Sequence, residues 1–171
     1  SGQPRCEVIE RPTQTVQLNG CSKTEGDAVF ANTDSRGYYF TEYSPDAARA
    51  LARSATTLKP IERLSLLGDE WWMVRGGRHD IGVYLDVASA FASDTASAVI
   101  GMLAGRLAVI GQDLVTASDR ARYQAWIRTQ FGPQLRALSL PGEAKDNDET
   151  HMRRATLLEL VGVTGNDPEV Q

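Results

Sequence analysis

The residues that most often carry out acid–base or metal chemistry are scarce in this chain of 171 residues. It has two histidines, His79 and His151, which lie 72 positions apart. A zinc hydrolase of the His-Glu-x-x-His type needs two histidines four positions apart on one helix, with a glutamate between them as general base. Neither histidine has that neighbourhood. We interpret His79–Asp80 as a cap or loop pair and His151 as a solvated side chain. A small hydrolase built on either histidine is the least favoured hypothesis.

Motifs for other site chemistry are also missing. The sequence has no Gly-x-Ser-x-Gly turn for a serine nucleophile and no GxGxxG or Gly-Lys pair for a phosphate. The carboxylate-rich run 143–149 lacks the central glycine and distal glutamate of a calcium loop, so we predict a solvated loop with helix-capping acids. Cys6 and Cys21 lie fifteen positions apart, and either a disulfide or two unrelated thiols fits. We predict no catalytic, cofactor-binding or metal-ligating residue in this chain.

Composition and charge exclude several classes of protein. Hydrophobic residues make up 42% and charged residues 23% of the chain, as in a folded protein of one domain or two small ones. There are 22 acidic residues against 18 lysines and arginines, so no basic surface for nucleic acid is expected. No uncharged stretch is longer than 95–105, which is too short to span a bilayer. We therefore expect neither a nucleic-acid nor a membrane partner.

The first forty-odd residues have the pattern of short strands. Runs of β-forming residues occur at 6–9, 15–18, 29–31 and 38–41, and the polar loop 32–37 between the last two favours a hairpin. These strands are too few to close a barrel or to build both sheets of a sandwich. The pattern predicts a small, incomplete antiparallel β-sheet that ends near residue 43.

From Ser44 onward the hydrophobic period becomes helical. Ser44–Pro45 is a helix start, with a capping hydroxyl followed by proline at the first helical position. Apolar positions then repeat at helical spacing in stripes within 48–55, 61–74, 81–91, 99–114, 123–127 and 152–161, and a short turn or helix is predicted at 134–139. Short connections favour antiparallel helix pairs of the HEAT or armadillo kind. The predicted fold class is α+β, mostly α.

Two local patterns leave alternatives. Gly101 and Gly105 form a small-x-x-x-small pair, which favours close packing against another helix of a soluble array. Trp71–Trp72 and Tyr38–Tyr39 are either a stacking platform or core residues, and core packing is favoured because Trp71 lies on a long apolar stripe. A further helix start at 166–169 and the incomplete sheet together lead us to expect that both ends are cut and that the chain is a fragment.

Two stretches resemble a known family. They are VFAN at 29–32 with GYYFTEY at 37–43, and ERLSLLGDEWWMVRGG at 62–77. In order and spacing they resemble the zinc aminopeptidases of the aminopeptidase N type, which include the endoplasmic-reticulum aminopeptidases. In that family the first pattern closes a β-sandwich, and the second opens the carboxyl-terminal helical domain. Phe40 stands where the family commonly has arginine, and Glu62 stands where it often has asparagine or aspartate. These two differences bear on the subfamily.

The resemblance implies a division of the chain and a function for its parent. It implies a partial β-sandwich at 1–43 and a partial helical carboxyl-terminal domain at 44–171. Zinc and the catalytic residues would lie in an earlier domain of the parent enzyme, and this piece would be non-catalytic, lining the peptide chamber. Its partners would be the parent's catalytic domain and peptide substrate, with self-association of the fragment where surface is exposed. A stand-alone helical-repeat interaction module is the alternative.

Overall fold

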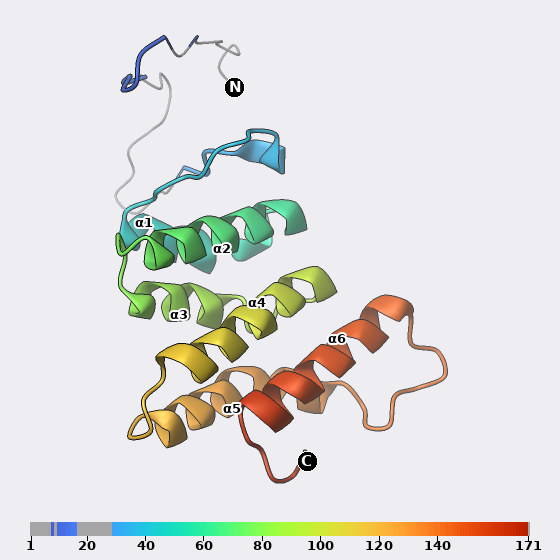
Figure 1. Ribbon diagram of the computed structural model, residues 1–171. Coiled ribbons are helices and arrows are strands. Elements are labelled where there is room, and N and C mark those ends of the chain that lie inside the picture. Colours follow the sequence, from blue (N-terminus) through green and yellow to red (C-terminus); the bar gives the residue numbers. More distant parts are fainter. Residues whose placement is uncertain (1–7, 9, 17–28, 171) are drawn as a thin grey trace.

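The computed structural model describes residues 8, 10–16 and 29–170, and this part of the chain is mostly helical (Figure 1). Its six α-helices are α1 (Pro45–Arg53), α2 (Pro60–Arg75), α3 (Ile81–Ala90), α4 (Ser97–Val109), α5 (Arg120–Ala137) and α6 (Asp148–Leu158). Two π-helical turns, Ile110–Leu114 and Glu159–Thr164, continue α4 and α6. The 3-10 turns Thr33–Ser35 and Ala55–Thr57 flank α1. The predominantly helical fold is therefore confirmed.

The helices are stacked in three successive pairs along the chain (Figure 1): α1 contacts α2 at one end, α5 contacts α6 at the other, and α3 and α4 lie between them. The colour gradient shows that the two helices run in opposite directions in the α3–α4 and α5–α6 pairs. Along the stack α1 contacts α3, while α4 contacts both α2 and α6. Because each pair covers the apolar face of the next, the array behaves as a solenoid whose repeats depend on their neighbours.

Local sequence explains where several helices begin. Ser44 caps α1 by accepting a hydrogen bond from the backbone N–H of Ala47, and Pro45 follows it. Asp80 caps α3 by accepting from Gly82 at 2.7 Å, and Asn147 caps α6 by accepting from Thr150 at 2.9 Å. The predicted start at Ser44 is thereby confirmed, and of the His79–Asp80 pair, predicted as a cap or loop pair, Asp80 is the cap.

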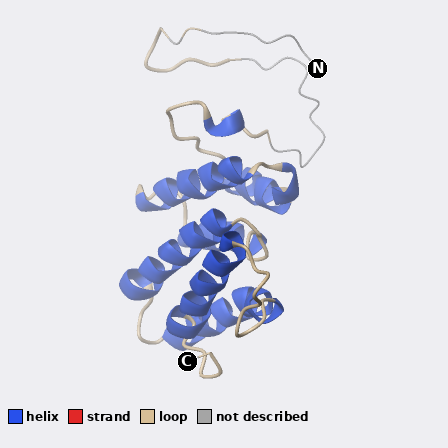
Figure 2. Cartoon of the chain, turned by 90° about the vertical axis from the view of Figure 1, so that its right-hand side faces the viewer, coloured by secondary structure: helices blue, strands red, loops and turns tan. Residues whose placement is uncertain are grey.

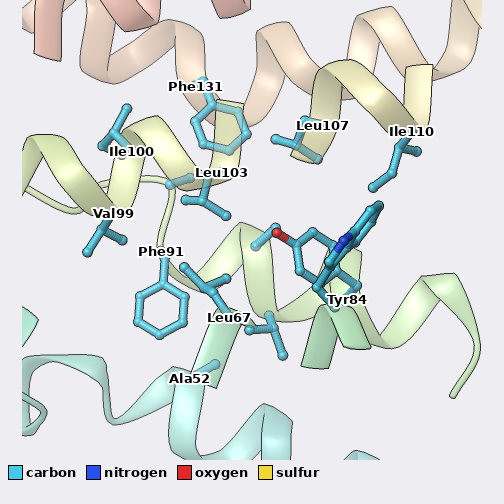
Figure 3. Close-up of a cluster of buried hydrophobic side chains, with 14 of the residues drawn as sticks. Ala52, Leu67, Tyr84, Phe91, Val99, Ile100, Leu103, Leu107, Ile110 and Phe131 are labelled. Atoms are coloured by element: carbon cyan, nitrogen blue, oxygen red, sulfur yellow. The ribbon is translucent and has the colours of Figure 1, made fainter. Parts of the chain in front are cut away.

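A single hydrophobic core runs through all three pairs. Its fully buried side chains come from successive helices, among them Leu67 of α2, Tyr84 of α3, Leu103 of α4 and Phe131 of α5 (Figure 3). The indole of Trp71 meets the ring of Tyr84 edge to face at 5.3 Å between centroids, which is a favoured aromatic geometry. Trp71 is 3% exposed, so its predicted core position is correct.

The predicted hairpin at 29–41 is not a strand pair. No strand occurs in the described residues (Figure 2); residues 29–43 form bends and a 3-10 turn instead. The other predicted strands, 6–9 and 15–18, lie partly outside the described residues, and their described positions are not strand either. Side-chain hydrogen bonds hold segment 29–43 in place of a ladder, because a two-stranded hairpin alone is only marginally stable.

Helix α5 does not stop before Pro133, although the sequence indicated a helical stripe at 123–127 and a separate short turn or helix at 134–139. The helix runs without interruption from Arg120 to Ala137. Phe131 and Leu135, on either side of the proline, are 0% and 2% exposed. Their burial against the core outweighs the backbone hydrogen bond that proline removes.

Two predicted packing faces are also corrected. On α6 the stripe Met152–Ala155 faces solvent, with Met152 60% exposed, and the buried face carries Arg154 and Leu157 instead. A charged Arg154 lies inside because Asp146 pairs with it. On α4 both Gly101 and Gly105 are exposed, and a Cβ added to either would meet nothing within 4 Å. A cavity of about 260 Å³ separates this glycine pair from α6 and the turn after it, so the expected close packing is not made there.

One helical stretch, Ser97–Leu114, is long and apolar enough to cross a membrane by length and composition alone. Its inner side chains, among them Ile100, Leu103 and Leu107, are completely buried. This stretch contacts α2 and α6 and 39% of it is buried, so core packing accounts for its inner face.

Candidate functional site

His79 is held by a buried hydrogen bond to a carboxylate rather than in a catalytic arrangement. Its Nδ1 lies 2.8 Å from Oε1 of Glu70, and the two side chains are 5% and 1% exposed. Its Nε2 lies 3.9 Å from Glu42, which also pairs with Arg78. The first histidine therefore links α2 to the segment that precedes α1, with both ring nitrogens facing carboxylates.

His151 lies apart from this cluster, exposed in the first turn of α6, where the sequence placed it. Within the described ranges no group of three histidine, cysteine, aspartate or glutamate side chains is arranged to hold a metal ion. Cys6 and Cys21 lie outside the described residues. The two histidines are not brought together, so the described part of the chain offers no fitting donor set for zinc.

The carboxylates of loop 143–149 are engaged in structural contacts. Asp146 accepts from the backbone N–H of Glu143 at 2.8 Å and pairs with Arg154; both interactions lower the pKa of Asp146. Glu149 accepts from the backbone N–H of Ser97 at 2.5 Å, which lowers the pKa of Glu149. Glu149 thereby caps the start of α4, and Asp146 connects the loop to Arg154 of α6.

The motif at 62–77 is a packing device of helix α2. Arg63 pairs with the buried Asp94 at 3.1 Å, Leu66 is fully buried, and Trp71 packs in the core. Asp69 is only 7% exposed, and this burial raises the pKa of its carboxyl. Each of these positions connects α2 to another element, so the spacing of the motif reflects the inner face of the helix.

Segment 29–43 is fixed to itself by a small set of hydrogen bonds. The backbone N–H of Ala31 donates to the Tyr43 hydroxyl at 3.0 Å, and the Tyr39 hydroxyl donates to the Ala31 carbonyl at 3.1 Å. The Asn32 side chain accepts from the N–H of Gly37 at 2.8 Å and donates to its carbonyl at 3.1 Å. Asn32 is 6% exposed, so this closed loop is built around a buried amide.

A second set of contacts fixes the same segment to α2. Glu62 accepts from the backbone N–H of Asp34 at 3.0 Å and from that of Lys59 at 2.8 Å, and both bonds lower the pKa of Glu62. The hydroxyls of Ser35 and Ser65 lie 2.6 Å apart. Glu62 therefore caps α2 and anchors the preceding segment at the same time.

The fixed segment presents an exposed surface, which we call the aromatic face and define by Tyr38, Tyr39, Phe40 and Trp72. Their exposures are 107%, 54%, 65% and 45%. The rings of Phe40 and Trp72 lie 5.6 Å apart, and the guanidinium of Arg75 lies 5.3 Å from the Trp72 ring. Clustered exposed aromatic side chains with an arginine are the composition typical of protein interfaces.

This face was only partly predictable from the sequence. Tyr38–Tyr39 and Trp71–Trp72 are either a platform or core residues by sequence, and the favoured core position is correct for Trp71 alone. Trp72 lies one position beyond the buried stripe of α2 and so points away from the core. That offset is the signal in the sequence that separates the two tryptophans.

Comparison with known families agrees with these observations. The family described as ERAP1-like C-terminal domain matches residues 28–171. No curated protein and no solved structure matches the chain significantly. The family match covers both the segment that carries the aromatic face and all six described helices. The chain therefore belongs to the ERAP1-like C-terminal domain family.

Proposed function

We propose that this chain is a non-catalytic carboxyl-terminal part of a zinc-dependent aminopeptidase. The observation that carries the proposal is the family match over residues 28–171. The zinc and the catalytic residues belong to an earlier domain of the parent, and the helical array lines the chamber in which the parent shortens peptides from their amino ends. The division into a partial sandwich at 1–43 and a helical part at 44–171 remains part of this proposal.

The aromatic face gives the proposed domain a place to meet the rest of its parent. It lies on segment 29–43 and the outer side of α2, at the amino-terminal end of the described stack. Aromatic side chains of this size contribute most when they are buried in a protein contact. In the parent, the earlier domains cover Phe40 and Trp72.

The test of the catalytic part of this proposal is an activity assay of the purified chain. We expect no hydrolysis of aminoacyl-arylamides with or without added zinc. Metal-dependent hydrolysis by the chain alone contradicts the proposal, and loss of that hydrolysis in His79→Ala or His151→Ala would favour the small hydrolase.

The second candidate function is a stand-alone helical-repeat interaction module, which the exposed aromatic face also favours. The reading frame that encodes the chain distinguishes the two candidates. An aminopeptidase part requires a His-Glu-x-x-His segment upstream in the same polypeptide. A frame without that segment contradicts the aminopeptidase proposal and supports the interaction module.

The interface role has its own test in the whole polypeptide that carries this chain. Phe40→Ser and Trp72→Ser are expected to lower its peptidase activity by weakening the contact between domains. Val163→Ser, at an equally exposed apolar position after α6, is the matched control and is expected to leave activity unchanged. Equal activity of all three variants contradicts the interface role.

A further inference from the structure

A cavity of about 350 Å³ opens between three helical elements, and no residue of the aromatic face lines it. This volume lies in the range of sites that hold small organic molecules. Its apolar walls come from the start of α3, the π-helical turn after α4 and the start of α5, namely Ile81, Leu85, Ile110, Leu114, Tyr123 and Trp126. Leu114 lies at the opening and is 56% exposed.

Hydrogen bonds to neighbouring backbone carbonyls fix the walls of this cavity. The Tyr123 hydroxyl donates to the Leu107 carbonyl at 2.7 Å, which fixes the tyrosine ring as one wall. Arg120 donates to the carbonyls of Gly111 and Val115 at 3.1 and 3.3 Å, which fixes both ends of the π-helical turn. Because these bonds are made within the protein, the walls are held in place before any ligand enters.

The π-helical turn is what directs apolar side chains into this space. Such turns are uncommon and occur frequently at functional sites. A Cβ added to Gly111 would lie 3.0 Å from the Tyr123 ring, so the backbone of the turn passes directly against that wall. Close approach of the turn and α5 brings Ile110 and Tyr123 to the same cavity.

The polar rim of the cavity carries no net charge. Arg122 pairs with Asp119 at 3.0 Å, and the Thr116 hydroxyl donates to the same carboxylate at 2.9 Å. Since Asp119 and Arg122 are the charged residues of the lining and neutralise each other, the rim selects neither an anion nor a cation. From the apolar walls and the neutral rim we propose that this cavity binds an uncharged aromatic or branched aliphatic molecule.

Two probes with the same ring system test this inference. N-phenyl-1-naphthylamine is uncharged, and 8-anilino-1-naphthalenesulfonate adds one sulfonate to the same rings. Titration of the purified chain with the neutral probe should give saturable fluorescence and a raised melting temperature, because a ligand that binds only the folded state stabilises it. The sulfonate is expected to bind about tenfold or more weakly. Equal or tighter binding of the sulfonate overturns the proposal.

Variants locate the bound probe. Val115→Phe fills the cavity from its lining and is expected to weaken binding of the neutral probe at least about tenfold. Val109→Phe, on the exposed side of α4, is the matched control and should bind as the native chain does. If Val115→Phe fails to fold, Trp126→Phe is used in its place. Loss of energy transfer from tryptophan to the bound probe in this variant also places the probe in the cavity. Loss of binding in Trp72→Ser instead places the probe on the aromatic face and overturns the proposal.

Discussion

At the scale of single residues, charged groups inside the helical array determine how its elements meet. Asp94, with a side chain only 2% exposed, pairs with Arg63 of α2, and its other oxygen accepts from the backbone N–H of Ala96 at 2.9 Å. Gln134 of α5 donates to the Asp94 carbonyl. The loop between α3 and α4 is therefore tied to α2 and α5 through one aspartate.

Removing one partner of this pair is expected to cost more than removing both. Asp94→Ala leaves Arg63 unpaired and only 16% exposed, and should lower the free energy of unfolding by about 3 kcal/mol. Arg63→Met in the Asp94→Ala background should restore part of that loss. Urea unfolding of the two single variants and the double variant measures the coupling, and strictly additive effects contradict a paired geometry.

The pKa shift of Glu149 predicts a dependence of stability on pH. The Ser97 N–H lowers the pKa of this carboxyl below its ordinary value of 4.5, so the folded state favours the ionised form. Its contribution is complete above pH 4.5 and is lost as the pH falls below that value. Glu149→Gln should therefore be less stable at pH 7, and its stability should fall less steeply between about pH 5 and pH 3 than that of the native chain.

The pKa shift of Asp69 is opposite in direction to that of Glu149. Burial raises the pKa of Asp69, so protonation favours the folded state and its contribution improves as the pH falls. Asp69→Asn should remove a gain in folding stability that occurs as the pH falls. Glu149→Gln should instead remove a loss of folding stability over the same change. Urea midpoints measured for both variants across the same pH series test the two signs together, and slopes that change in the same direction contradict the assignment.

At the scale of elements, the helices were predictable where caps and burial agree. Ser44–Pro45 opens α1, and Val99, Leu103 and Leu107 are completely buried on α4 as their spacing indicates. The predictions were wrong where the secondary structure of a residue depends on partners elsewhere in the chain. Tyr38 and Phe40 have strand propensity, yet no described strand pairs with them, and Pro133 stays helical because the core holds both of its flanks.

The small-residue pattern on α4 gives a prediction at this scale. Because a Cβ at Gly101 or Gly105 meets nothing within 4 Å, alanine at either position should raise the free energy of unfolding by about 0.5–1 kcal/mol. Gly165→Ala is the contrasting variant, since its Cβ would lie 2.5 Å from the Val161 carbonyl and should destabilise the fold. Thermal unfolding compares the three, and destabilisation by both α4 substitutions would mean that another helix does pack on this face.

At the scale of the whole molecule, the stack of helix pairs could be predicted from the sequence, whereas the exposure of its aromatic face could not. The stack follows from helical periodicity and short connections, which act over neighbouring residues. The aromatic face depends on how segment 29–43 is folded against α2 through Glu62 and Ser65, contacts that span 28 and 30 positions. No local sequence pattern indicates contacts between residues so far apart in the chain. The aromatic residues could therefore be identified as candidates, but their exposure was not predicted.

That exposed face leads to a prediction about association. The free chain leaves Tyr38, Phe40 and Trp72 in contact with water, and the apolar area they expose favours contact between copies. Light scattering should show a mean mass that rises with protein concentration for the native chain. Phe40→Ser with Trp72→Ser should abolish that rise without lowering the melting temperature, because neither side chain is in the core. Met152→Ser, at an exposed apolar position on α6, should leave the rise unchanged; a strict monomer at high concentration, or equal loss in all variants, contradicts association through the aromatic face.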